Sequence, residues 1–214
     1  MDYNFLSRVL WVVSIGIVTC GSISIILKGY GRKNLLLLFY LSAILLLEGI
    51  SYYYSEYNSR QLNIFLFHLS GFVHFFFITL CYYYYFDRGK KLVYILVLSI
   101  GFILLLVNST AYNGTETFHL YTNVLYNLAV VALSFLYFIG IVINGIRPQK
   151  FELFFNSIVL IYFSYDAIIS LSSNFLINEH LDLVAPFWLF RTLLLQLFYV
   201  SLINFAWQTG KILK

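Results

Sequence analysis

The sequence consists of long apolar runs separated by short polar gaps. Seven runs reach or approach the roughly 20 residues that an α-helix needs to cross a bilayer. The predicted spans cover residues 6–27, 34–54, 63–86, 92–107, 118–144, 151–173 and 184–207. The fourth span is the shortest, and no gap is long enough to hold a folded domain. The pattern therefore predicts one all-α domain over residues 1–214, a polytopic membrane protein with seven transmembrane helices.

Composition excludes a water-soluble fold. The chain is 61% hydrophobic and 10% charged, and its mean hydropathy is +0.85. Soluble domains carry about 25% charged residues. The formal net charge is +4, but no basic tract suits nucleic acid. We therefore expect the lipid bilayer as a partner and no nucleic acid. No small-residue cleavage site follows the first span, so we expect that span to be retained.

Lys and Arg are distributed unevenly between the gaps. Ten basic residues fall in the first, third and fifth gaps and the C-terminal tail, whereas the N-terminal segment and the second gap hold two. Cytoplasmic loops are enriched in Lys and Arg. The distribution therefore predicts an N-terminus outside the cell and a cytoplasmic C-terminus.

Several predicted spans carry an ionisable residue at a similar depth. Glu48, Asp166 and Arg191 each lie about six or seven residues from the outer boundary, which at 1.5 Å per residue is roughly 9–11 Å. His68 lies slightly nearer the boundary, and His74 lies near the middle of its span. An arginine at the centre of a bilayer costs roughly 2.5–3.5 kcal/mol on insertion scales, so it normally faces protein or water and has a partner.

This layer allows two interpretations. In the first, it lines an outward-facing pocket for a small-molecule or lipid ligand, where Arg191 would suit an anionic group and the carboxylates a cation. In the second, Glu48 and Asp166 neutralise Arg191 as a buried ion pair that holds the helices together. Both stay open, because one cluster can serve both purposes. The candidate ligand-binding residues are Glu48, His68, His74, Asn123, Asn127, Tyr162, Asp166, Trp188, Arg191 and Gln196.

Several motifs that would indicate an enzyme or a cofactor are absent. The seventh span has no lysine for a retinal Schiff base, and the chain has no HxxxH, HExxH or GxSxG motif. His68 and His74 are six residues apart, about 120° around a helix, so they do not share a ligand face. The sequence predicts no cofactor and no metal site, and it favours a protein that is not an enzyme.

Small residues form a stripe along the first span. Gly16, Cys20 and Ser24 recur every four residues and so lie on one face of a helix. Small side chains allow transmembrane helices to approach closely. We therefore expect this face to pack against a neighbouring helix.

Three groups of motifs carry a resemblance to a known group of proteins. They are His74-Phe75-Phe76 followed by Tyr82–Phe86, Ile161–Ser164 followed by Ser172–Leu176, and Ile203–Trp207 before a basic tail. From the third span onward the chain resembles small seven-helix membrane proteins common in Bacteroidota, which are often encoded beside sensor histidine kinases. The resemblance implies a sensor or accessory module, and we expect it in a bacterial inner membrane.

Three functions fit these observations. The first is a receptor-like sensory module, which would need a separate partner such as a sensor kinase because residues 208–214 are too few for an output domain. The second is a small-solute transporter or channel, which requires a continuous polar path. The third is a membrane-embedded lipid hydrolase, similar to lysoplasmalogenase-like proteins, with Glu48 and Asp166 as an acid–base pair.

Overall fold

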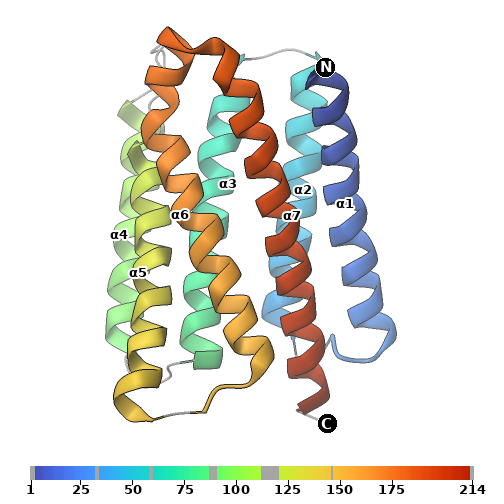
Figure 1. Cartoon of the computed structure of the whole chain (residues 1–214), viewed down its shortest axis with the longest axis vertical. Coiled ribbons are helices and arrows are strands. Elements are labelled where there is room, and N and C mark those ends of the chain that lie inside the picture. Colours follow the sequence, from blue (N-terminus) through green and yellow to red (C-terminus); the bar gives the residue numbers. More distant parts are fainter. Residues whose placement is uncertain are drawn as a thin grey trace.

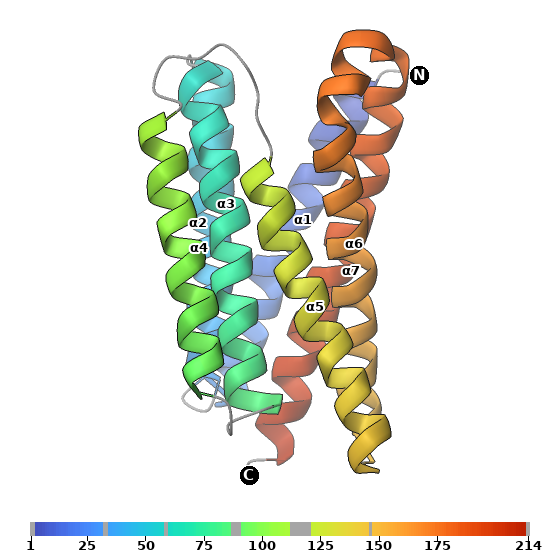
Figure 2. The same ribbon diagram turned by 90° about the vertical axis from the view of Figure 1, so that its left-hand side faces the viewer.

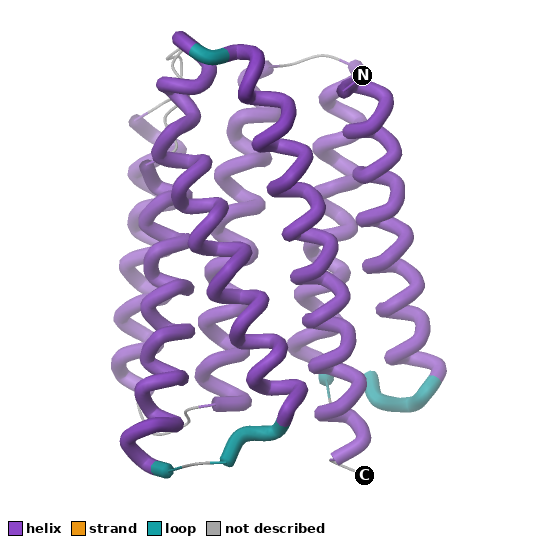
Figure 3. The backbone as a smooth tube through the Cα atoms, in the orientation of Figure 1, coloured by secondary structure: helices purple, strands orange, loops and turns teal. Residues whose placement is uncertain are grey.

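The computed structural model describes residues 3–31, 34–57, 60–86, 91–111, 121–145 and 147–212. These residues are helical almost throughout, and no strand occurs among them (Figure 3). The elements are α1 (Tyr3–Leu27), α2 (Leu35–Tyr57), α3 (Arg60–Cys81), a short π-helix η1 (Tyr82–Phe86), α4 (Lys91–Ala111), α5 (Tyr121–Asn144), α6 (Lys150–Glu179) and α7 (Leu181–Ile212). The all-α prediction is confirmed.

The helices have the length and composition of membrane spans. In the described residues six helices are long and apolar enough to cross a bilayer, and the apolar part of α4, Lys91–Val107, is shorter. Helices suit this environment because they satisfy their own backbone hydrogen bonds where no water is present. Large apolar side chains such as Val142 (81% exposed) cover the outside of the bundle. The chain is therefore a helical, multi-pass membrane protein.

The expected gap between the sixth and seventh spans is itself helical. Helix α6 continues to Glu179 and α7 begins at Leu181, so that only His180 separates them. The backbone N–H of His180 still donates to the carbonyl of Leu176 at 3.0 Å. Hydropathy identifies only the apolar part of a helix. The predicted spans therefore do not include the more polar end of α6 or the start of α7.

Six of the helices form a closed ring. Around it the order is α1, α2, α3, α5, α6 and α7, and α7 also packs against α1 (Figures 1 and 2). Helix α4 lies outside the ring, against α3 and α5. The two termini lie at opposite ends of the bundle, which we call the N-terminal end and the C-terminal end (Figure 1).

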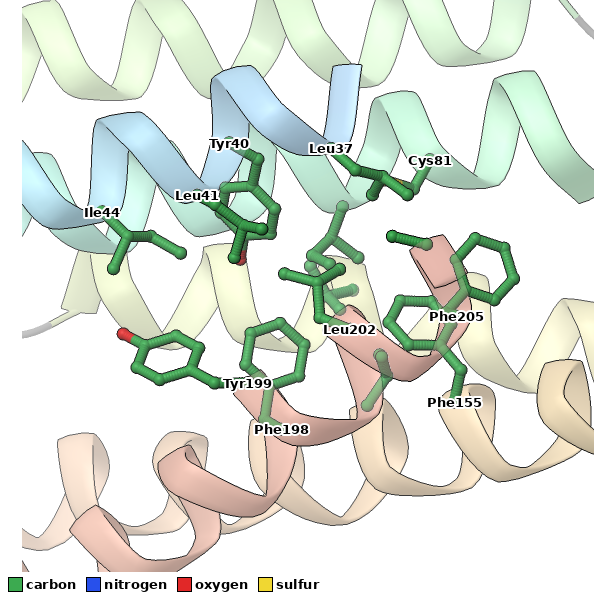
Figure 4. Packing of buried hydrophobic residues seen from close by; sticks show 14 of the residues in the cluster. Leu37, Tyr40, Leu41, Ile44, Cys81, Phe155, Phe198, Tyr199, Leu202 and Phe205 are labelled. Carbon is green, nitrogen blue, oxygen red and sulfur yellow. The ribbon is translucent and has the colours of Figure 1, made fainter. Parts of the chain in front are cut away.

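Aromatic side chains make up a large part of the buried core from the middle of the bundle toward its C-terminal end. Figure 4 shows Tyr40, Phe198 and Phe205 packed among aliphatic neighbours. Phe155 of α6 and Phe205 of α7 stack with their ring centroids 4.7 Å apart. Tyr162 of α6 stacks on Phe198 of α7 at 5.4 Å. Each such pair contributes about 0.5–1.5 kcal/mol beyond its buried area. These contacts fix α6 and α7 relative to each other on the C-terminal side of the layer of ionisable residues that includes Asp166 and Arg191.

The predicted small-residue stripe does not form the close contact of α1. Gly16 has no atom within 4 Å of an added Cβ, and Cys20 is exposed. The close approach is made instead by Gly21, where an added Cβ would lie 2.2 Å from Cδ1 of Ile203 on α7. The packing face of α1 therefore differs from the one that the four-residue spacing indicated.

Candidate functional site

The centre of the polar layer is an ion pair between neighbouring helices. Nε of Arg191 on α7 donates to Oδ1 of Asp166 on α6. Nδ2 of Asn127 on α5 donates to the other carboxylate oxygen, Oδ2, at 2.8 Å. The side chains of Arg191 and Asp166 are only 16% and 10% exposed. Asp166 is thus held by a cation on one oxygen and an amide on the other, and three helices are joined at one point.

Two aromatic rings flank the Arg191 guanidinium. Its central carbon lies 5.0 Å from the ring centroid of Trp188, one turn earlier in α7, and 5.4 Å from that of Phe67 on α3. The two rings meet edge to face at 5.8 Å. A cation over an aromatic face is stabilised by about 0.5–2 kcal/mol. The guanidinium is therefore fixed in orientation by Asp166 and by both rings.

The terminal nitrogens of Arg191 keep their hydrogen-bonding capacity. Only Nε forms a hydrogen bond, and the two Nη groups bond to no residue in the described part of the chain. Together these groups carry four N–H donors. Neither belongs to the fully buried polar atoms that lack a partner. With respect to the described residues, Arg191 therefore presents free donors beside the bound carboxylate.

Glu48 does not join the ion pair, contrary to the structural interpretation of the sequence. Its Oε2 accepts a hydrogen bond of 2.9 Å from Nε1 of Trp11 on α1. The Trp11 ring in turn stacks on Tyr52 of α2 at 4.4 Å. Glu48 lies within electrostatic range of Arg191 without contacting it. Sequence reasoning missed Trp11 because it placed the site among other spans, although a buried indole N–H normally requires an acceptor.

The two histidines have different surroundings. Nδ1 of His68 on α3 lies 3.4 Å from Oγ1 of Thr122, near the start of α5. Nδ1 of His74 lies 2.6 Å from the hydroxyl of Tyr40, and its ring stacks on Tyr199. His68 therefore belongs to the polar layer, whereas His74 belongs to the aromatic core below it.

The remaining candidates do not converge on the Arg191 guanidinium. Gln196 donates from Nε2 to the carbonyl of Leu10 at 2.9 Å and so faces α1. Tyr162 is buried in the stack with Phe198. Asn123 is buried against Gly71, and its Oδ1 has no hydrogen-bond partner in the described residues. The structure thus brings Asn127, Asp166, Trp188 and Arg191 into one cluster, with Glu48 nearby.

A second polar cluster lies toward the C-terminal end. The Tyr82 hydroxyl donates to Oδ1 of Asn156, which also accepts from Oγ of Ser134 at 3.1 Å. Nδ2 of Asn156 donates back to the carbonyl of Ser134 at 3.3 Å. All three residues are buried. These groups satisfy one another's hydrogen bonds, and they join α5 and α6 to the π-helix that ends the third span.

The chemistry available in the main cluster is recognition of charge. In the described residues no group of three or more His, Cys, Asp and Glu side chains could hold a metal ion. Both oxygens of Asp166 are already bound by Arg191 and Asn127. Among the charged groups that the structure describes here, the hydrogen-bonding capacity left over consists of the Arg191 Nη donors and one oxygen of Glu48.

Comparison with known proteins found no matching family model, no matching curated protein and no matching solved structure. The resemblance to small Bacteroidota membrane proteins stays a prediction. A function for this chain must therefore be argued from the geometry around Arg191.

Proposed function

We propose that this chain is a receptor-like membrane sensory module that binds a small polar ligand at Arg191 and signals through a separate partner protein. The observation that supports the proposal most directly is that the Arg191 guanidinium is fixed in position but only partly hydrogen-bonded by the described residues. It is held in place by Asp166, Phe67 and Trp188, yet its Nη groups have no partner among the described residues. Ionisable groups inside a membrane bundle are costly and mark functional sites by default.

The proposal includes an orientation with the N-terminal end outside. The described basic residues at the C-terminal end support it, since that end carries Lys28, Lys91, Arg147, Lys150 and Lys211. Such an excess is typical of the cytoplasmic side. The site would then face outward, in a membrane such as the bacterial inner membrane, and the partner would be reached from the cytoplasmic side.

The packing below the site favours sensing over transport. Between Arg191 and the C-terminal end the core is filled mainly by aromatic rings, including Phe155, Phe198 and Phe205. The polar cluster around Asn156 also lies in this region, but its groups hydrogen-bond to one another. A transporter needs a continuous polar path through this part of the core. A sensor instead needs rigid packing that couples its ligand site to the opposite end of the bundle. The hydrolase alternative requires Glu48 and Asp166 to work together as an acid–base pair, and Asp166 is held by Arg191 and Asn127 through both of its oxygens.

The proposal can be tested by ligand binding to the purified protein in lipid nanodiscs. A library of small charged metabolites would be screened by thermal shift, and hits would be measured by calorimetry. The matched variant is Arg191→Gln combined with Asp166→Asn, which removes both charges of the ion pair together. Gly16→Ala is the control, because nothing lies within 4 Å of the added methyl group. We expect the control to bind as the parent does and the double variant to lose binding.

Signalling and transport are separated by two further measurements on the same sample. Hydrogen exchange over residues 205–212 should change when a ligand binds, because the stacked rings connect the site to α7 at the C-terminal end. Uptake of the radiolabelled ligand into proteoliposomes should be absent. Uptake that depends on Arg191 would instead establish transport and refute the sensory proposal.

A further inference from the structure

Two opposite charges in the N-terminal half of the bundle interact electrostatically, yet within the described residues they form no ion pair with each other. Glu48 and Arg191 are within electrostatic range of each other. In the described chain, however, the ion pair of Arg191 is with Asp166, and the hydrogen bond of Glu48 is with Trp11. Each charge is therefore held on its own side of the site by a partner from a different helix.

Both charged groups keep unused hydrogen-bonding atoms. Oε2 of Glu48 accepts from Trp11, whereas Oε1 has no hydrogen-bond partner in the described chain. Arg191 uses Nε and leaves both Nη groups unbonded. None of these atoms is among the fully buried atoms without a partner, which in the described residues belong to Thr79, Asn123, Tyr137 and Tyr199. The side chains of Glu48 and Arg191 are half-buried, so the described residues do not fully enclose these atoms.

The chemistry of these atoms selects one class of ligand. A simple anion would satisfy Arg191 but leave the Glu48 carboxylate unpaired. A simple cation would satisfy Glu48 but leave the Arg191 donors unpaired. Unpaired charged groups in a poorly hydrated site are penalised, so a molecule that serves both has a large advantage.

We propose that the ligand is a zwitterion of the amino-acid type, with its carboxylate on the Nη groups of Arg191 and its ammonium on Oε1 of Glu48. This inference rests on the proposed function, since it names the ligand class of the same site. Arg191 suits the carboxylate because a guanidinium can donate two parallel hydrogen bonds to it. Trp188 and Phe67 would contact the carbon atoms next to that carboxylate.

The test compares zwitterions with probes that carry one charge. Glycine, β-alanine, 4-aminobutyrate and 5-aminopentanoate carry the two charges at increasing separation, whereas propionate and propylamine each carry one. Binding to the protein in nanodiscs would be measured by calorimetry. We expect one of the zwitterions to bind about 10- to 100-fold more tightly than either single-charge probe, since one added charge-assisted hydrogen bond corresponds to such a factor.

Glu48→Gln supplies the decisive comparison. It keeps an acceptor for the Trp11 indole and removes the charge, so the preference for the zwitterion should vanish while propionate binds at least as tightly as before. An unchanged preference in this variant would overturn the inference. Equal binding of propionate and the zwitterions to the parent protein would also overturn it, while leaving an anion site at Arg191 and the proposed function intact. Absence of binding by all six probes would remove the zwitterion class.

Discussion

Replacing Gly21 by alanine should destabilise the bundle through a single contact. An added Cβ at this position would lie 2.2 Å from Cδ1, 2.6 Å from Cγ1 and 3.1 Å from Cγ2 of Ile203. Ordinary van der Waals contact begins at 3.4 Å, so the side chain or the helix must move by about 1 Å. Overpacking of this kind costs about 1–3 kcal/mol. We expect Gly21→Ala to lower the free energy of unfolding by that amount relative to the parent protein.

The assay is reversible unfolding in mixed micelles, followed by circular dichroism. Gly16→Ala is the matched control, because it lies in the same helix and has open space around it. It should be neutral or slightly stabilising, since alanine has the higher helix propensity. Ile203→Ala removes all three crowding atoms, so adding Gly21→Ala to it should cost almost nothing. The coupling energy of this cycle should therefore approach the full cost of Gly21→Ala.

Two results would refute the reasoning. Equal effects of Gly16→Ala and Gly21→Ala would mean that α1 does not present Gly21 to α7. Additive effects of Gly21→Ala and Ile203→Ala would mean that the strain arises elsewhere. Either outcome would contradict the contact between α1 and α7 described above. It would also call for another explanation of how α1 is oriented so that Trp11 reaches Glu48.

Other substitutions test the polar contacts by the same unfolding assay. Asp166→Asn alone should lower the free energy of unfolding by about 3–5 kcal/mol, because it leaves the Arg191 charge inside the bundle without its partner. Adding Arg191→Gln should recover much of that loss. Purely additive losses would contradict the ion pair. Asn156→Ala should cost more than Tyr82→Phe, because it leaves the buried Tyr82 hydroxyl without an acceptor, at about 1–3 kcal/mol. Tyr82→Phe removes only one of the donors to Asn156, so a loss above about 1.5 kcal/mol would show a further role for the hydroxyl.

The positions of the helices and the depth of their charges could be predicted from the sequence. Hydropathy marks apolar runs directly, because the bilayer requires them. Counting residues from the ends of those runs placed Asp166 and Arg191 at one level, and opposite charges inside a bundle are expected to meet. The structure confirms that contact and adds Asn127, which shares the carboxylate.

The rotation of each helix about its axis could not be predicted. A membrane-spanning helix is apolar toward lipid as well as toward protein, so its buried face leaves little trace in the sequence. Glu48 could therefore have turned to Arg191, but it meets Trp11 instead. Gln196 turns to α1 for the same reason. Which acceptor a side chain finds depends on packing against neighbours that lie far away in sequence.

The peripheral position of α4 has a consequence for how the chain is threaded. Helices α3 and α5 are neighbours in the ring and run in the same direction, from the N-terminal to the C-terminal end (Figure 2). Two adjacent parallel segments require a return passage between them, and α4 supplies it from outside the ring. Without that passage α5 would run upside down, and Asn127 could not meet Asp166 at the level of Phe67. Helix α4 thus acts as a spacer that sets the direction of the last three helices and brings the polar residues of α3, α5, α6 and α7 to one level.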